Sequence, residues 1–100
     1  MVKHIILWQL KDELSDIQKA GVRDGAKRGL EGLKGKIKGL TDIKVYISPL
    51  ETSNCDMMLE ATFESFEALK GYSVNPLHQD VANAKVRPYI SNRVCMDYNV

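Results

Sequence analysis

His4 and His78 are the only histidines of this 100-residue chain, and imidazole is the side chain best suited to proton transfer near neutral pH. His78 follows Asn75-Pro76, a pair typical of a helix start, with Asn as the cap and Pro in the first turn. At the third helical position, the helix dipole disfavours the charged imidazolium. We therefore expect a neutral His78 ring that accepts a proton.

Tyr72 precedes His78 across the predicted turn between two helices, so its phenol is expected near the same cavity. A neutral histidine and a tyrosine hydroxyl form a base and a hydrogen-bond donor for removing a proton next to a carbonyl. The alternative is that His78 merely fills a helix start and Tyr72 packs at the domain edge, since helix-start placement alone is unspecific.

His4 shares one face of a predicted strand with Ile6 and Trp8. If this face lines the space between two sheets, the three residues form an apolar cavity with one polar group, which is typical of a small-molecule site. Leu59, on the third predicted strand, is expected to add a further ligand contact. The alternative for His4 is a hydrogen-bonded histidine in an ordinary core.

Metal ligation is weakly supported by the sequence. His4, His78, Cys55 and Cys95 are scattered, without paired spacings such as CxxC or HxxxH, so we expect no metal. No phosphate-binding loop is present in the glycine-rich region, and no other cofactor is expected. Cys95 and Asp97 share a strand face and are expected to point into the cavity, although a cysteine is often only a small buried hydrophobe.

Composition narrows the class of protein. Apolar residues make up 44% and charged residues 27%, which fits one globular domain over residues 1–100. Fourteen basic and thirteen acidic residues leave a charge of +1, so neither nucleic acid nor a membrane surface is an expected partner. Without an export signal or a membrane span, and with two cysteines, the expected location is the cytoplasm.

Hydrophobic spacing and capping signals predict the elements that position these residues. Ser15 and Gln18 form a capping box before a helix that is expected to extend to about Ile37 and stop at Gly39. Five glycines make this helix intrinsically poor, so tertiary packing must hold it or its middle is broken. The other predicted elements are strands over 2–10, 42–48, 56–64 and 91–99 and helices over 66–72 and 76–85.

The order β-α-β-β-α-α-β predicts a ferredoxin-like α+β domain, with a four-stranded antiparallel sheet and helices on one face. Both faces of the first strand carry large apolar side chains, and the helices of one subunit cover only one of them. Because a monomer rarely exposes such a patch, we expect a homodimer whose sheets face each other as an α/β barrel.

The chain resembles the stress-responsive dimeric A/B barrel domain family. The resemblance lies in the opening 2–8 block with 11–13, in 33–40, in 62–65 with Tyr72, in Asn75 to His78, and in the closing 97–98. It implies a ferredoxin-like subunit, a homodimer and a largely apolar cavity in each subunit. Plant members include the polyketide cyclase that makes olivetolic acid, an aldol-type cyclase without a cofactor. Its catalytic histidine and tyrosine correspond to His78 and Tyr72, and its cavity histidine corresponds to His4.

Two functions remain open from the sequence. One is a stress-associated homodimer that binds a small apolar ligand in its cavity without an established reaction. The other is a cofactor-free lyase or cyclase acting on an oxo-substrate, with His78 as base and Tyr72 steadying the oxyanion. The plant cyclase lines its pocket with bulky aromatics from the first helix, where this chain has Gly21, Val22, Gly25 and Ala26, so the same substrate is not expected.

Overall fold

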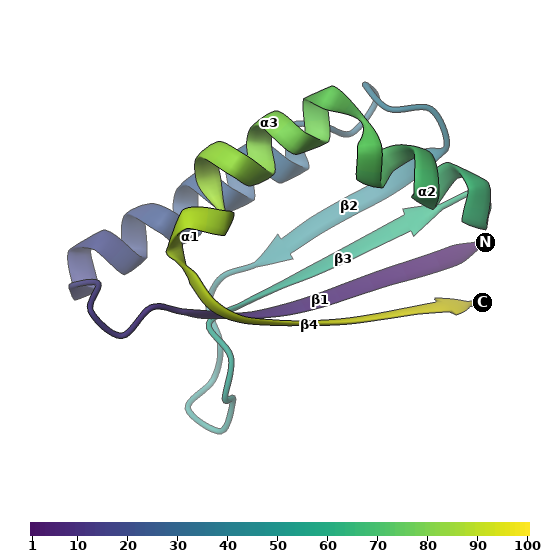
Figure 1. Cartoon of the computed structure of the whole chain (residues 1–100). Coiled ribbons are helices and arrows are strands. Elements are labelled where there is room, and N and C mark those ends of the chain that lie inside the picture. The colour runs from purple at the N-terminus through teal and green to yellow at the C-terminus, as the bar shows by residue number, and fades with distance from the viewer.

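The computed structural model describes residues 1–100 and contains one antiparallel sheet with all helices on one of its faces (Figure 1). The elements in chain order are β1 Val2–Leu10, α1 Asp16–Glu31, β2 Leu40–Tyr46, β3 Met57–Phe63, α2 Phe66–Val74, α3 Pro76–Lys85, the 3-10 helix η1 Arg87–Tyr89, and β4 Ile90–Asn99. The strand order is β2-β3-β1-β4. This arrangement confirms the ferredoxin-like α+β fold. None of the three α-helices has the length and apolar character of a transmembrane helix.

The predicted caps mark the helix starts. Ser15 accepts a hydrogen bond from the Gln18 N–H at 3.1 Å, and the Gln18 side chain accepts one from the Ser15 N–H at 2.8 Å. Ser65 caps α2, and Asn75 caps α3 by accepting from the Leu77 N–H at 2.9 Å. These side chains satisfy N–H groups that have no partner inside the helix, which fixes where each helix begins.

The first helix ends earlier than the spacing of its apolar residues predicts. It runs unbroken to Glu31, and turns rather than helix carry the chain to β2. Gly35 and Gly39 there have φ values of 81° and 83°, a left-handed conformation that interrupts a helix and costs glycine little. Leu33 and Ile37 are nevertheless buried in the core, so their apolar spacing reflects burial in a turn region.

The core lies between the helices and the inner face of the sheet. Val2, His4, Ile6, Trp8 and Leu10 of β1 are all buried on this side. The helices of the same subunit therefore already cover the face that carries Ile6 and Trp8, and the expectation that this face lines a space between two sheets is wrong. The side chains of β1 alternate as predicted, but the helices cover the face of Ile6 and Trp8 and leave that of Ile5 and Leu7.

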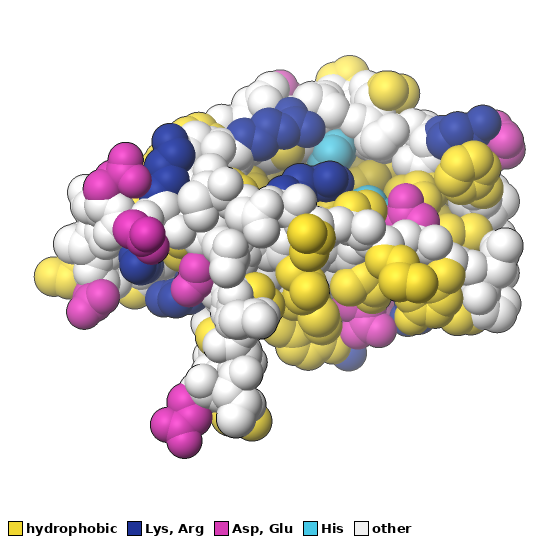
Figure 2. Space-filling view, turned by 60° about the horizontal axis from the view of Figure 1, so that its bottom comes forward, with side chains coloured by type: hydrophobic (Ala, Val, Ile, Leu, Met, Phe, Trp, Pro, Cys, Tyr) yellow, Lys and Arg dark blue, Asp and Glu magenta, His cyan; other side chains and the backbone are white.

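The other face of the sheet has no helix over it (Figure 1). The strand registers place Ile5 opposite Met96, and Leu7 between Val94 and Met58. Met96 and Val94 are exposed by 67% and 51%, and hydrophobic side chains gather on this side of the molecule (Figure 2). The structure thus leaves one apolar face of the sheet uncovered, as the two-sided apolar pattern of the first strand predicted.

Candidate functional site

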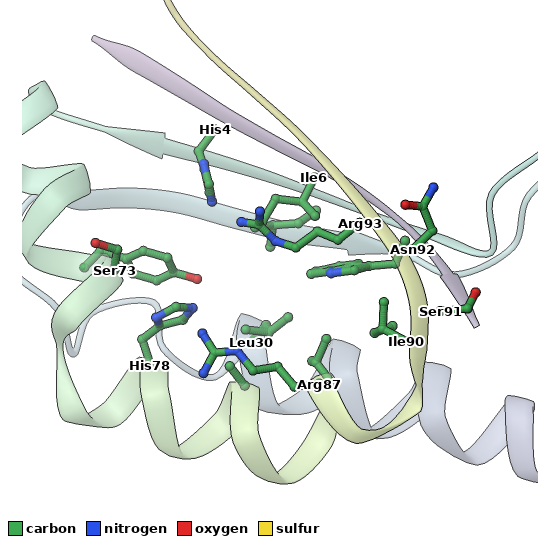
Figure 3. A pocket seen from close by; sticks show the side chains of 15 residues that line it. His4, Ile6, Leu30, Ser73, His78, Arg87, Ile90, Ser91, Asn92 and Arg93 are labelled. Carbon is green, nitrogen blue, oxygen red and sulfur yellow. The ribbon is translucent and has the colours of Figure 1, made fainter. Parts of the chain in front are cut away.

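A cavity of about 390 Å³ lies between the inner face of the sheet and α3 (Figure 3). Fifteen residues line it, eight of them hydrophobic, and they come from all strands except β2 and from every helix. The six residues singled out from the sequence are all among them: His4, Ile6, Trp8, Leu59, Tyr72 and His78. The structure therefore brings these six residues to one cavity inside the subunit.

The break between α2 and α3 positions Tyr72 and His78. Asn75 ends α2 and also caps α3, and Pro76 occupies the first turn of α3 where no N–H is needed. Tyr72 thereby lies in the last turn of α2 and His78 in the first turn of α3. Their ring centroids are 4.1 Å apart and their planes are inclined by 31°, so the two rings lie against each other.

Both rings end in a buried polar atom without a protein partner. The Tyr72 hydroxyl and the His78 Nδ1 have no hydrogen-bond partner in the structure, although most buried polar side-chain atoms in proteins do. Leaving such an atom unsatisfied costs about 1–3 kcal/mol. A buried hydroxyl in a cavity wall is a group that a bound molecule would satisfy.

Burial sets the protonation states of this pair. It raises the pKa of the Tyr72 phenol far above its ordinary value, so the hydroxyl keeps its proton and remains a donor. Burial has the largest effect on His78 and lowers the pKa of its imidazole. The Ser73 backbone raises this pKa by a smaller amount, and the charges of Arg87 and Arg93 lower it further. The neutral His78 ring expected from the sequence is thus favoured mainly by desolvation.

His4 lies across the cavity from His78 (Figure 3) and forms a hydrogen bond to a residue of the edge strand β4. It stands opposite Asp97 in the register of β1 and β4, and its Nδ1–H donates to the Asp97 carboxylate. This bond holds the His4 ring in one orientation. Cys95 Sγ lies 3.7 Å from the same Nδ1. Cys95 and Asp97 do not line the cavity, contrary to expectation, and both are exposed on the edge strand β4.

His4, Cys95 and Asp97 are also the group best placed to hold a metal ion, with potential ligand atoms within 4.8 Å of one another. The strand register brings them together, which linear spacing did not reveal. A metal would have to displace the His4–Asp97 contact and take the thiolate form of Cys95. In the metal-free protein, burial, followed by the charge of Asp97, raises the pKa of the Cys95 thiol. The contact with Asp97 orients the His4 ring.

Sequence reasoning missed several polar residues of the cavity. Arg87, Arg93, Ser73 and Asn92 line it together with the two histidines. Arg93 could have been found, because strand alternation puts it on the same face as Cys95 and Asp97. Arg87 lies in the short η1 turn between α3 and β4, and no periodic pattern indicates where its side chain points.

The comparison with family models matches residues 2–100 to the stress responsive A/B barrel domain. A dimeric ferredoxin-like protein of unknown function from Bacteroides fragilis is 26% identical, with a TM-score of 0.92 over 99% of this chain and 95% of that one. A comparison with curated protein sequences finds no match.

Two more distant solved structures share the fold alone. One is a ferredoxin-like protein of the same family from Mesorhizobium loti, 17% identical, with a TM-score of 0.74 over 99% of this chain and 95% of that one. The other is a hydroxynitrile lyase from Passiflora edulis, 18% identical, with a TM-score of 0.71 over 97% of this chain and 90% of that one. The family match covers nearly the whole sequence, and the chain belongs to the stress responsive A/B barrel domain family.

Proposed function

We propose that this protein binds a small molecule in the cavity between its sheet and α3, with no established reaction. The observation that carries the proposal is the Tyr72 hydroxyl, which is buried in the cavity wall without a partner. Hydrophobic walls with a few convergent polar groups are typical of ligand sites, and about 390 Å³ is at the lower end of their usual volumes. Tyr72, His78 and His4 would bind the polar end of the ligand, and Ile6, Trp8 and Leu59 its apolar body.

We also propose that the protein is a homodimer formed through the uncovered face of the sheet. Ile5 and Leu7 of β1, with Val94 and Met96 of β4, make this face apolar along two neighbouring strands. Large exposed apolar patches are rare on monomers, and a two-fold axis lets the same face cover itself. The structurally similar protein from Bacteroides fragilis is described as dimeric. In such a dimer, each subunit keeps its own cavity, because the cavity lies on the other side of the sheet.

A cytoplasmic location is consistent with the cysteines. Cys55 and Cys95 are both free, and free thiols persist in reducing compartments. The match to the stress responsive A/B barrel domain also supports a role in a stress response.

Native mass spectrometry of protein purified from its own cells tests ligand binding. The proposal predicts a dimer with one small molecule per subunit, retained at low activation energy. The Tyr72→Phe variant, prepared in the same way, should retain less of it, because the variant lacks the unpartnered hydroxyl. Wild-type protein with no bound molecule, together with no binding in a broad ligand panel, would contradict the proposal.

A second candidate function is proton transfer on an oxo-compound, and it is favoured by the Tyr72–His78 pair. The neutral His78 would take a proton next to a carbonyl, and the protonated Tyr72 would donate a hydrogen bond to the oxygen that gains negative charge. The same histidine could serve cyanohydrin cleavage. The neutral His78 would take the hydroxyl proton, a carbonyl would form as the carbon–carbon bond breaks with its electron pair leaving on cyanide, and the protonated His78 would return the proton to give HCN. The Passiflora lyase shares the fold.

The catalytic candidate is tested with poly-β-keto thioesters and aromatic cyanohydrins as substrates for wild type and His78→Ala. General-base catalysis typically contributes about 10²–10⁴-fold, so the variant should lose most of the turnover. Equal turnover by both proteins would remove His78 as the base, and the binding function would remain.

A further inference from the structure

Two of the four arginines of the chain form ion pairs with acidic residues, and the other two form none. Arg23 lies 3.2 Å from the Asp56 carboxylate, and Arg28 lies 3.1 Å from the Asp24 carboxylate. Arg87 and Arg93 form no ion pair with any acidic residue. Both of these unpaired arginines line the cavity, and the two paired ones do not.

Neutral partners hold Arg87 in place. Its guanidinium donates to the Gln79 and Asn83 side-chain oxygens, each at 2.7 Å. These amides orient the guanidinium without cancelling its charge. Arg93 enters from β4 on the opposite wall, so the two guanidinium groups reach into the cavity from different sides (Figure 3). Basic side chains likewise flank the hollow in which the histidines are visible (Figure 2).

No acidic residue lines the cavity. Asp97 is the nearby carboxylate. It lies on the same face of β4 as Arg93, and it accepts a hydrogen bond from His4. The chain as a whole has a charge of only +1, so this local excess of positive charge is specific to the site. Arg87 and Arg93 are both exposed residues, and two unpaired guanidinium groups that face one site attract an anion.

We propose that the ligand of this cavity is a small molecule with an apolar body and one anionic head group, a carboxylate or a phosphate, which Arg87 and Arg93 bind. The proposal rests on the binding function and adds the chemical class of the ligand. The guanidinium fork fits the two oxygens of either head group, and the Tyr72 hydroxyl supplies a further donor. Ile6, Trp8 and Leu30 form the apolar part of the wall, where a short alkyl or aryl body fits.

The experiment compares octanoate, octyl phosphate and the neutral 1-octanol by isothermal titration calorimetry. Octanoate or octyl phosphate should bind at least about tenfold more tightly than octanol, and the tighter of the two identifies the head group. Arg87→Gln and Arg93→Gln should each weaken binding of the anion about 10- to 100-fold and leave octanol unchanged. Arg28→Gln removes the same charge from the outside of α1 and should leave all three affinities unchanged. Higher salt should weaken binding of the anion only.

The outcomes separate this inference from the binding function. The anionic ligand would be overturned if octanol bound as tightly as both anions. It would also be overturned if the arginine variants bound the anions as well as wild type does. In either case the cavity would still be a ligand-binding site. If none of the three compounds bound to the folded wild-type protein, the class of ligand would be overturned. The native mass spectrum would then decide separately whether the cavity holds any ligand.

Discussion

The Tyr72 ring lies against the His78 ring, with 4.1 Å between the centroids, and each ring carries a buried polar atom that no protein group satisfies. Asn75 and Pro76 produce this arrangement by ending one helix and starting the next between the two residues. Phe63 of β3 packs on Tyr72 from the sheet, at 5.0 Å between ring centroids. The pair is therefore fixed by the backbone and the core, while its two buried polar atoms have no protein partner.

The Tyr72→Phe variant tests whether the Tyr72 hydroxyl binds a ligand or stabilises the fold. The ring still packs on His78 and Phe63, and the unsatisfied buried hydroxyl is removed. We expect the ligand-free variant to melt at the same temperature as wild type or a few degrees higher, because about 1 kcal/mol corresponds to roughly 4–8 °C in a domain of this size. Ligand affinity should fall about tenfold. A lower melting temperature with unchanged affinity would assign the hydroxyl to folding instead.

His78 should make stability depend on pH. Its pKa in the folded protein lies below the ordinary value near 6.5, so between these two pH values the unfolded chain binds a proton that the folded protein does not. Stability should therefore fall as the pH is lowered from 7 through 6.5 toward the folded pKa. In His78→Gln, this part of the fall should be absent. The measurement is urea unfolding of both proteins from pH 7.5 to 5, and parallel curves would contradict the burial of a neutral His78.

The capping signals were the most informative part of the sequence. Ser15 with Gln18, Ser65, and Asn75 with Pro76 predicted all three helix starts, because a cap side chain acts on N–H groups only two or three residues away. The end of α1 was predicted wrongly, since apolar spacing continues through Leu33 and Ile37 although the backbone there is not helical. Apolar residues that are buried in a turn give the same spacing in the sequence as apolar residues that are buried on a helix.

The composition of the site was only partly predictable. The sequence identified the two histidines and Tyr72 as candidates, and the structure brings them to one cavity. It could not decide which apolar face of β1 the helices cover, since both faces are apolar at the centre. The contact of His4 with Asp97 depends on the pairing of β1 with the last strand of the chain, which no local pattern encodes.

Two glycines of α1 provide a matched pair for testing how closely the helices pack. A Cβ at Gly21 would meet no atom within 4 Å, whereas a Cβ at Gly29 would lie 2.8 Å from Val81 Cγ1 on α3. Gly21→Ala should stabilise the protein by about 0.5–1 kcal/mol through helix propensity. Gly29→Ala should destabilise it by about 1–3 kcal/mol, because the stiff Val81 side chain cannot move away easily. Denaturant unfolding measures both, and equal effects would contradict the close approach of α1 and α3.

The uncovered sheet face should govern association. Met96→Glu places a charge within the proposed interface, at a cost on the order of 3 kcal/mol when it is buried unpaired. The dimer should then dissociate at least about a hundredfold more readily. Ile17 is an exposed apolar residue of α1, and Ile17→Glu should leave association unchanged. Light scattering after size-exclusion chromatography gives the mass, and circular dichroism checks that each variant is folded. Wild-type protein that is monomeric at micromolar concentration would contradict the dimer.

The most direct test of the cavity uses Trp8, the single tryptophan of the chain, which is 4% exposed and lines the cavity. Bromine quenches tryptophan fluorescence at close contact, so titration with 8-bromooctanoate and 8-bromo-1-octanol reports whether a ligand enters beside Trp8. We predict saturable quenching by at least one of them, reversed by the unbrominated compound and abolished in Ala82→Met, where the larger side chain fills the cavity. Linear, unsaturable quenching that is the same in wild type and Ala82→Met would show that no ligand enters, and would contradict the account.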